Sequence, residues 1–395
     1  MAAASQRPLS GLRVLDLSRL LPGGYCTLLM ADLGADVIKV EEPGTGDYMR
    51  MMPPLTVRGE SAMHLAINRG KRSMTCNLRT SEGREVFLDL ARRADILVES
   101  FRPGVMDRLG VGYETLRSAS AGLVYVAISG YGQSGPYTAK AGHDIDYLAY
   151  AGALSFTGHP DAGPWQPGLQ IGDLAGGMAA LIAALGALRV RDATGEGQLC
   201  DVSMTDVVLS WTAVHAAAYA ASGTPPAPGT ATLNGGLACY GVYECADGRH
   251  VAVGALEPRF FAELLDGLGL PSVLGEAQLD PARQDELRER IAGVLATRRR
   301  DEWIKVLGEC DACVAPVLDM GEALDDAGAR AREMVTWTRG SGHGLPTVGT
   351  VPRFSRTPGR PGGPPASLGA DTEAVLAELG RGPDDVAALR AAGAV

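Results

Sequence analysis

Apolar runs typical of β-strands alternate with amphipathic helical stretches through the first third of the chain. The pattern predicts, in chain order, a strand, a helix, a strand, a helix and two further strands, over residues 13–18, 22–33, 36–41, 81–93, 95–99 and 123–129. Strands that alternate with helices usually pair in parallel, so we expect an open α/β sheet. Ligands of such sheets bind beyond the carboxyl ends of the strands, which here are the loops after Ser18, Glu41, Glu99 and Ser129.

The pattern changes in the second half of the chain. Residues 172–191 predict a long helix of small apolar residues, and a stretch rich in Gly and Pro follows at 222–236. A hairpin around Asp247-Gly248, three helices and an apolar strand are then predicted, over residues 240–253, 258–268, 280–297, 300–307 and 313–318. A second Pro- and Gly-rich stretch, 347–367, precedes a final acidic helix.

These shifts predict two domains of different class. The first is a large α/β domain with an open, Rossmann-like parallel sheet, and the second is a smaller α+β domain. We place the large domain at residues 1–221, a linker at 222–236, the small domain at 237–335, and a return linker with a C-terminal helix that rejoins the large domain at 336–395.

Composition narrows the class of protein. With 395 residues, 46% of them apolar, the chain is long enough for a sizeable core. The formal net charge of −10 argues against a nucleic-acid partner. The N-terminal segment has no apolar core typical of an export signal, and no run approaches the roughly 20 apolar residues that span a bilayer. We therefore expect a cytoplasmic protein with no membrane partner.

The cysteine pattern does not indicate a disulfide framework. There are seven cysteines, an odd number scattered through a long chain. Cys310 and Cys313 make a single CxxC, with neither a second CxxC nor paired histidines at metal-site spacing. We expect buried free thiols and no metal site.

A glycine loop after the strand at 123–129 matches a dinucleotide-binding pattern only weakly. Gly130, Gly132 and Gly135 fit GxGxxG, but Pro136 follows at once and no acidic residue lies about 20 residues further on. The pattern therefore disfavours an NAD-dependent dehydrogenase. The glycines better suit a tight loop that lets the backbone approach a ligand.

Two separated residues are candidate proton carriers, His143 in GHDIDY and Asp173 in GDLAGG. Both lie where turns lead into helices, and we expect the amides near Leu174 and Ala175 to stabilise a developing oxyanion. Each residue also has a purely structural interpretation, Asp173 as a helix N-cap and His143 as a polar loop residue. Glu257, before Pro258, is either a helix-dipole partner or a carboxylate that orients an imidazole.

Basic residues gather in two stretches near strands. NRGKRS holds Arg69, Lys71 and Arg72, and Arg102 and Arg108 follow the strand that ends at Glu99. Such clusters are either solvated surface or, at the ends of strands, a binding site for a phosphorylated ligand.

Several segments together resemble the CoA-transferase family III. In the first 215 residues they are LSGLRVLDLSRLLPGGY, LGADVIKVEEPGTGDYMR, NRGKRS, ESFRPGVMDRLG and SGYGQSGPY. Five further segments, which extend nearly to the tail, resemble the α-methylacyl-CoA racemase branch of this family: GHDIDY, GDLAGG, ECADGRHVAVGALEPRFF, DACVAPVL and PRFSRT.

The resemblance implies an isomerase that interconverts (R)- and (S)-2-methylacyl-CoA thioesters through an enolate. His143 and Asp173 fall on the acid/base residues of such racemases, and Glu257 falls on the carboxylate that pairs with the histidine. No cofactor is expected, because CoA enters as part of the substrate. The resemblance also implies an interlocked homodimer, in which each active site lies between the large domain of one subunit and the small domain of the other.

Sixteen positions are expected to bind the substrate or its CoA, from the resemblance and from the strand-end loops: Lys39, Arg69, Lys71, Cys76, Asn77, Leu78, Arg79, Ser100, Phe101, Arg102, Arg108, Gly142, Asp144, Ile145, Asp146 and Tyr147. Met178 and Met204 are candidate lining of the acyl pocket. The chain departs from the racemase pattern at Glu42, where an arginine is usual, and at Leu169-Gln170, in PGLQ where the racemases have PLNL.

Two other functions fit the same residues. In a CoA-transferase, Asp173 would be a nucleophile that forms a mixed anhydride and then an acyl-enzyme. A non-catalytic acyl-CoA-binding protein would keep the fold without turnover. A second proton carrier, His143, favours the racemase, since a transferase needs none on the opposite face of the substrate.

Overall fold

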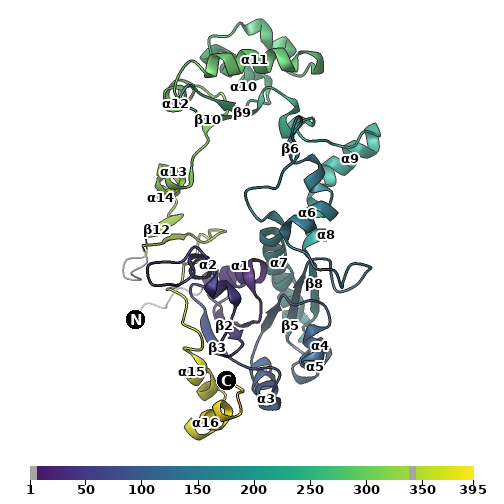
Figure 1. Cartoon of the computed structure of the whole chain (residues 1–395), viewed down its shortest axis with the longest axis vertical. Helices are drawn as coiled ribbons and strands as arrows, with labels where there is room; N and C mark the ends of the chain where they lie inside the picture. Colours follow the sequence, from purple (N-terminus) through teal and green to yellow (C-terminus); the bar gives the residue numbers. More distant parts are fainter. Residues whose placement is uncertain (1–6, 338–343) are drawn as a thin grey trace. The chain divides into compact units, whose positions relative to one another are not determined.

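The computed structural model describes residues 7–337 and 344–395. Its residue contacts group the chain into two compact units (Figure 1). Unit 1 comprises Met1–Ala151, Leu169–Trp211 and Ala327–Val395, and unit 2 comprises Gly152–Gly168 and Thr212–Asp326. The domain bounds expected from the sequence stay a prediction.

Unit 1 is built on a six-stranded parallel sheet in the order β3-β2-β1-β4-β5-β8. The strands are β1 Arg13–Asp16, β2 Asp36–Glu41, β3 Arg72–Thr75, β4 Ile96–Glu99, β5 Val124–Ser129 and β8 Leu199–Ser203. This confirms the predicted parallel α/β sheet. Strand β8 was not predicted, because only its last two residues are buried and its apolar pattern is correspondingly short.

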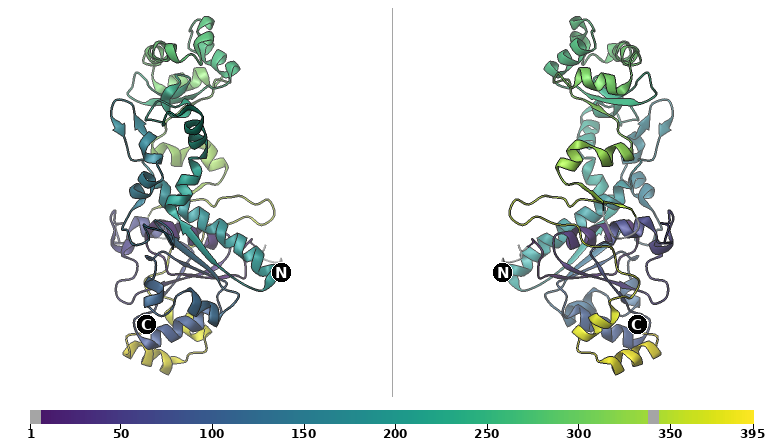
Figure 2. Two further views of the ribbon diagram at one scale, coloured as in Figure 1. Left: turned by 90° about the vertical axis from the view of Figure 1, so that its right-hand side faces the viewer. Right: turned by 90° about the vertical axis from the view of Figure 1, so that its left-hand side faces the viewer.

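Helices cover both faces of this sheet (Figures 1 and 2). Because side chains alternate along a strand, Val14 of β1 packs with α1 and α7 on one face, whereas Leu15 packs with α3, α5, α15 and α16 on the other. The helices of unit 1 are α1 Leu20–Asp32, α2 Ala62–Ile67, α3 Ser81–Ala91, α4 Val105–Arg108, α5 Tyr113–Ala119, α6 Asp144–Tyr150, α7 Ile171–Thr194, α8 Met204–Trp211, α14 Ala327–Ala331, α15 Thr372–Glu378 and α16 Pro383–Ala391.

Helix α7 is the predicted small-residue helix, and by length and composition it could cross a membrane. Its most apolar 18-residue window has a mean hydropathy of 1.8. The expectation that no apolar segment is long enough to span a bilayer is therefore wrong for this helix. Half of that window is buried inside the protein, as in a core helix.

Helix α7 packs closely on α1. Gly177 permits this packing, because a Cβ there would lie 2.6 Å from the Pro22 carbonyl oxygen.

The C-terminal segment closes the β3 edge of the sheet. The Ser73 amide donates to the Asp371 carboxylate at 2.8 Å, and the Thr75 amide donates to the Thr372 hydroxyl at 3.0 Å. Side chains thus satisfy edge amides that would otherwise be open to another strand. The short strands β12 Val335–Trp337 and β13 Pro346–Val348 pair antiparallel before this segment.

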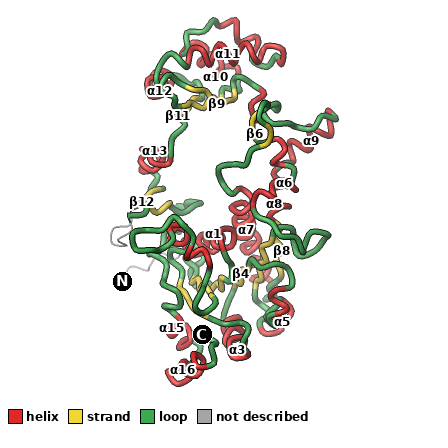
Figure 3. Tube along the Cα trace, in the orientation of Figure 1, coloured by secondary structure: helices red, strands yellow, loops and turns green. Residues whose placement is uncertain are grey.

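Unit 2 contains an antiparallel sheet in the order β11-β10-β9 with helices packed against it (Figure 3). Strands β9 and β10 form the predicted hairpin, in which Gly248 has a φ of +73°. The elements of unit 2 are β6 Gly158–His159, β7 Gly163–Pro164, α9 Ala213–Ser222, β9 Tyr240–Glu244, β10 His250–Gly254, α10 Pro258–Gly267, α11 Gln284–Leu295, α12 Arg300–Leu307, β11 Val314–Pro316 and α13 Met320–Asp325.

A buried ion network fixes the loop that leaves β1. The Asp16 carboxylate is fully buried and accepts hydrogen bonds from the hydroxyls of Ser18 at 2.5 Å and Thr27 at 2.6 Å. Its Oδ2 lies 3.0 Å from the Lys71 ammonium and 3.9 Å from that of Lys39. Lys39 also donates to the Ser18 carbonyl at 2.9 Å, so a residue of β2 and the residue before β3 both hold the end of β1.

The charges in this network depend on one another. Burial alone would raise the pKa of Asp16, but Lys39 and Lys71 hold it well below its usual range. Burial lowers the pKa of Lys71 to about 8, and Asp16 opposes this effect. Removing one member therefore leaves its partners charged and buried.

We expect Asp16→Asn to lower the free energy of unfolding by about 3 to 5 kcal/mol, because Lys71 loses its only close carboxylate partner among the described residues. Asp36→Asn is the matched control. Asp36 is 36% exposed and pairs with Arg13 and Arg72, so its loss should cost less than about 1 kcal/mol. Urea unfolding of both variants measures the difference, and equal costs would show that the buried network does not stabilise the fold.

Candidate active site

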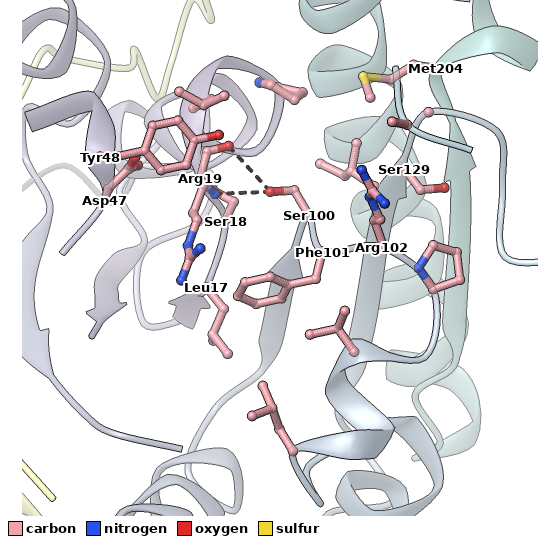
Figure 4. A pocket seen from close by; sticks show the side chains of 18 of the residues that line it. Leu17, Ser18, Arg19, Asp47, Tyr48, Ser100, Phe101, Arg102, Ser129 and Met204 are labelled. Carbon is pink, nitrogen blue, oxygen red and sulfur yellow. Dashed lines mark hydrogen bonds between the residues drawn. The ribbon is translucent and has the colours of Figure 1, made fainter. Parts of the chain in front are cut away.

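A cavity of about 700 Å³ lies in unit 1, beyond the carboxyl ends of the parallel strands (Figure 4). Its walls come from the loops after β1 to β5, with Asp173 from α7 and Met204 from α8. This is where an open α/β sheet is expected to bind its ligand. Of the two methionines expected in the acyl pocket, Met204 lines the cavity, whereas Met178 is 45% exposed and does not.

The centre of the cavity wall lies where the strand order reverses, between β1 and β4. The Arg19 amide donates to the Ser100 hydroxyl at 3.0 Å, and that hydroxyl lies 3.4 Å from the Arg19 carbonyl (Figure 4). The two loops are thereby joined. Because the Asp16 network holds Ser18, it also fixes this side of the cavity.

His143 and Asp173 both line this cavity. His143 is the N-cap residue of α6, where its amide donates to the Asp146 carboxylate at 2.9 Å and its side chain is exposed. Asp173 is the third residue of α7, whose N-cap is Gln170, so its structural interpretation as an N-cap is wrong. The structure therefore places an imidazole and a carboxyl, 30 positions apart in the sequence, on one cavity.

The environment of Asp173 disfavours its charged form. Burial raises the pKa of this carboxyl to about 7, and the Asp144 carboxylate adds to the rise. Asp144 is held close because its Oδ1 accepts a hydrogen bond from the Asp173 amide, at an N···O distance of 3.0 Å. No ion pair compensates Asp173 within residues 7–337 and 344–395. Near neutrality this group can therefore both give and take a proton.

Tyr147 connects the two halves of the site. Its hydroxyl donates to the Gly142 carbonyl at 2.6 Å, beside His143, and burial followed by the Asp173 charge raises its pKa. A Cβ at Gly130 would lie 2.3 Å from the Tyr147 ring, so the loop after β5 needs glycine there. Tyr147 stays neutral and holds the start of α6 against this loop.

One of the amides expected to stabilise an oxyanion already donates a hydrogen bond within the protein. The Leu174 amide donates to the Gln170 carbonyl at 3.0 Å as the first hydrogen bond of α7, so it is not free to hold a ligand oxygen. The amide of Asp173 is likewise taken by Asp144. The expectation that amides near Leu174 stabilise an oxyanion is wrong for Leu174.

The structure separates the sixteen expected binding residues into two groups. Nine line the cavity: Cys76, Asn77, Leu78, Arg79, Ser100, Phe101, Arg102, Gly142 and Tyr147. Seven are not among its lining residues: Lys39, Arg69, Lys71, Arg108, Asp144, Ile145 and Asp146. Their binding roles stay predictions.

Three of the residues outside the lining are buried cations. Lys39 and Lys71 belong to the Asp16 network, and the Arg69 guanidinium donates to the Asp32 carboxylate at 2.7 Å. Their charges are compensated within the core of unit 1. Glu257 belongs to unit 2, as the N-cap residue of α10, and its pairing with an imidazole stays a prediction.

Several lining residues were not singled out from the sequence. Arg19 and Tyr48 follow β1 and β2, and Tyr131 follows β5. Lys140 also lines the cavity, with its ammonium 4.4 Å from the centre of the Tyr137 ring. The strand-end rule indicated the loops that hold the first three, but nothing in the pattern distinguished these side chains from their neighbours.

The described residues contain no group of three or more His, Cys, Asp or Glu side chains that could hold a metal ion. The seven cysteines are free thiols, four of them buried, in that part of the chain. The site offers proton carriers, hydroxyl groups and cations.

Comparisons with known proteins agree with the fold. A model of the family described as CoA-transferase family III matches residues 9–372. The alpha-methylacyl-CoA racemase of Mus musculus is 37% identical, and the alignment covers 96% of both chains. The succinyl-CoA:mesaconate CoA-transferase of Haloarcula hispanica is 34% identical over 95% of this chain and 97% of its own. A crystal structure of a CAIB/BAIF family protein from Brucella suis superposes with a TM-score of 0.84 at 31% identity, covering 95% of this chain and 100% of its own.

We expect Asp144→Asn to lower the pKa of Asp173 below its value of about 7, because the variant removes the neighbouring negative charge and keeps the hydrogen bond to the Asp173 amide. Titration of side-chain carboxyl carbons by NMR measures this, with Asp173→Asn to assign the signal. An unchanged titration would mean that Asp144 does not act on this carboxyl.

The raised pKa also predicts how stability depends on pH. An unfolded Asp ionises near pH 4, whereas Asp173 in the folded protein ionises near pH 7, so its contribution to stability falls as the pH rises between these values. Asp173→Asn should therefore gain stability relative to the wild type between pH 5 and pH 8 in urea unfolding. Asp192→Asn, an exposed position on the same helix, should show no such change, and the same flat result for Asp173→Asn would refute the prediction.

Proposed function

Because the chain belongs to the CoA-transferase family III, which matches residues 9–372, we propose that it acts on acyl-CoA thioesters and racemises 2-methylacyl groups by moving one proton at C2. Relatives named as racemases and as CoA-transferases match it at similar identity. The choice of racemisation over CoA transfer is therefore supported by the residues of the cavity. A carboxyl whose pKa is about 7 shares a cavity with an imidazole.

The chemistry of this reaction requires two carriers. The α-proton of a thioester is a weak acid, so removing it needs a base at close range and a site that stabilises the enolate. In the proposal, His143 works on one face of C2 and Asp173 on the other. Each supplies a general acid/base contribution of about 10²- to 10⁴-fold. The net oxidation state of the substrate does not change, and CoA takes part only as a portion of the substrate.

The protonation state of Asp173 makes the reaction reversible in this proposal. Racemisation needs one carrier protonated while the other is not, and the handedness of the substrate selects which. Since the pKa of Asp173 is raised to about 7, both its forms are populated near neutrality. The rate should follow a bell-shaped dependence on pH, whose limbs belong to the pair of carriers.

Two parts of the proposal come from the family resemblance alone. Glu257 pairs with the His143 imidazole, orients it and balances its charge when it is protonated. The active chain is a homodimer in which the small domain of one subunit completes the site of the other. Removing the Glu257 carboxylate would then lower the rate without preventing CoA binding.

CoA transfer is the second candidate, because relatives with that name match nearly the whole chain. In that reaction the Asp173 carboxylate attacks the thioester, the C–S bond breaks, and CoA leaves as the thiolate. A nucleophilic carboxylate must be ionised, and burial beside Asp144 opposes ionisation of Asp173. This observation favours proton transfer. An acyl-CoA-binding protein without turnover is the third alternative.

A single-enantiomer 2-methylacyl-CoA incubated in deuterium oxide separates the three functions. We expect deuterium at C2, seen by NMR, together with loss of optical purity, seen by chiral chromatography. Asp173→Asn should lower the exchange-with-racemisation rate by about 10²- to 10⁴-fold, because one carrier is lost.

The same incubation with a free carboxylic acid tests the rivals. Transfer of CoA to that acid without exchange at C2 would replace the racemase with the transferase. Binding of the thioester with neither exchange nor transfer would leave only the binding function. Asp192→Asn is the control, since this exposed residue lies on α7 outside the cavity lining and should not alter any of the rates.

A further inference from the structure

Glu42 joins two arginines at the wall of the cavity. Its carboxylate forms an ion pair with the Arg79 guanidinium and lies 3.8 Å from that of Arg19. The three residues belong to the loops after β2, β3 and β1, and all of them line the cavity. One carboxylate thus faces two cations where a ligand of the cavity can reach all three.

The preceding residue shows what a structural ion pair looks like in this fold. Glu41 is 5% exposed, and its carboxylate accepts two hydrogen bonds from Arg50, at 2.8 and 2.6 Å, and one from the Ser73 hydroxyl at 2.7 Å. The Glu42 side chain is 32% exposed, and those of Arg19 and Arg79 are 42% and 72% exposed. Ion pairs of that exposure contribute little to folding.

Arg19 keeps its place through contacts that do not involve Glu42. Its guanidinium carbon lies 5.3 Å from the centre of the Phe101 ring, and Figure 4 shows the two side chains next to each other. Its backbone is joined to Ser100. Removing the Glu42 carboxylate would therefore leave this cation at the cavity wall.

We propose that Glu42 occupies the place of a phosphate group of the substrate's CoA moiety between Arg19 and Arg79, and that this phosphate displaces it on binding. The inference rests on the proposed function, since it takes CoA as the ligand. Phosphate and carboxylate groups can both accept two hydrogen bonds from one arginine guanidinium, so one can replace the other. Glu42 then limits the affinity for CoA, because each binding event must break its contacts with the two arginines.

The test is the dissociation constant of free CoA, measured by titration calorimetry on the full chain. Glu42→Gln keeps the size of the side chain and removes its charge. We expect it to bind CoA about two- to fivefold more tightly than the wild type at low salt, the size of an exposed ion-pair effect. The gain should shrink towards none at about 0.5 M NaCl, because salt screens exposed charges.

Asp89→Asn is the matched control. Asp89 is also 32% exposed and bridges two arginines, Arg92 and Arg381, but it lies on α3 outside the cavity lining. The variant makes the same charge change, so it should leave the affinity for CoA unchanged. An equal gain in this variant would show a general effect of net charge and would overturn the proposal.

A second variant keeps the test independent of any single substitution. Arg79→Gln should weaken CoA binding, and in that background Glu42→Gln should give a smaller gain, because one of the two released cations is missing. Dephospho-CoA identifies the group that is bound. The gain disappears with this ligand if the 3′-phosphate is recognised and persists if the diphosphate is.

Two results would contradict the inference in different ways. Equal or weaker CoA binding by Glu42→Gln, with an unchanged melting temperature, would show that Glu42 only orders the arginines, and the proposed racemase would be untouched. Absence of CoA binding by the wild type would overturn both this inference and the proposed function.

Discussion

The chemistry of the site depends on one carboxyl that is partly buried beside another. Asp173 lies in the first turn of α7, where the helix dipole favours a negative charge, but burial and the nearby Asp144 outweigh that effect and raise its pKa to about 7. The hydrogen bond from the Asp173 amide to Asp144 keeps the two acids together. A group that neither holds nor loses its proton firmly suits proton transfer better than nucleophilic attack.

The rest of unit 1 holds this carboxyl at the edge of a cavity. The strand order places the loops of β1 and β4 side by side, and the Asp16 network fixes the first of them through Lys39 in β2 and Lys71 just before β3. Helix α7 presents Asp173 to the cavity because Gly177 lets it pack closely on α1. The ionic groups that stabilise the core, such as Lys71 and Arg69, are thereby distinct from those that face the cavity, such as Arg19 and Arg79.

The sequence predicted the parallel sheet and the loops that line the cavity, because long apolar periods and the strand-end rule are local or topological. It did not predict β8, whose pattern is short, or that the Leu174 amide makes the first hydrogen bond of α7. The other differences between the expected and the observed lining residues depend on which side chains are buried. Lys39 looks like Arg79 in sequence, and only tertiary contacts show that the first is enclosed by carboxylates and the second is exposed at the cavity.

The central claim is that His143 and Asp173 act on opposite faces of one carbon, and each face can be measured separately. The two enantiomers of a 2-methylacyl-CoA are incubated in deuterium oxide with His143→Asn and with Asp173→Asn, and exchange at C2 is followed by NMR. Each variant should exchange the proton of one enantiomer only, with configuration retained, and the two variants should prefer opposite enantiomers. If both variants exchange the same enantiomer, the two groups do not flank the reacting carbon and the account is wrong.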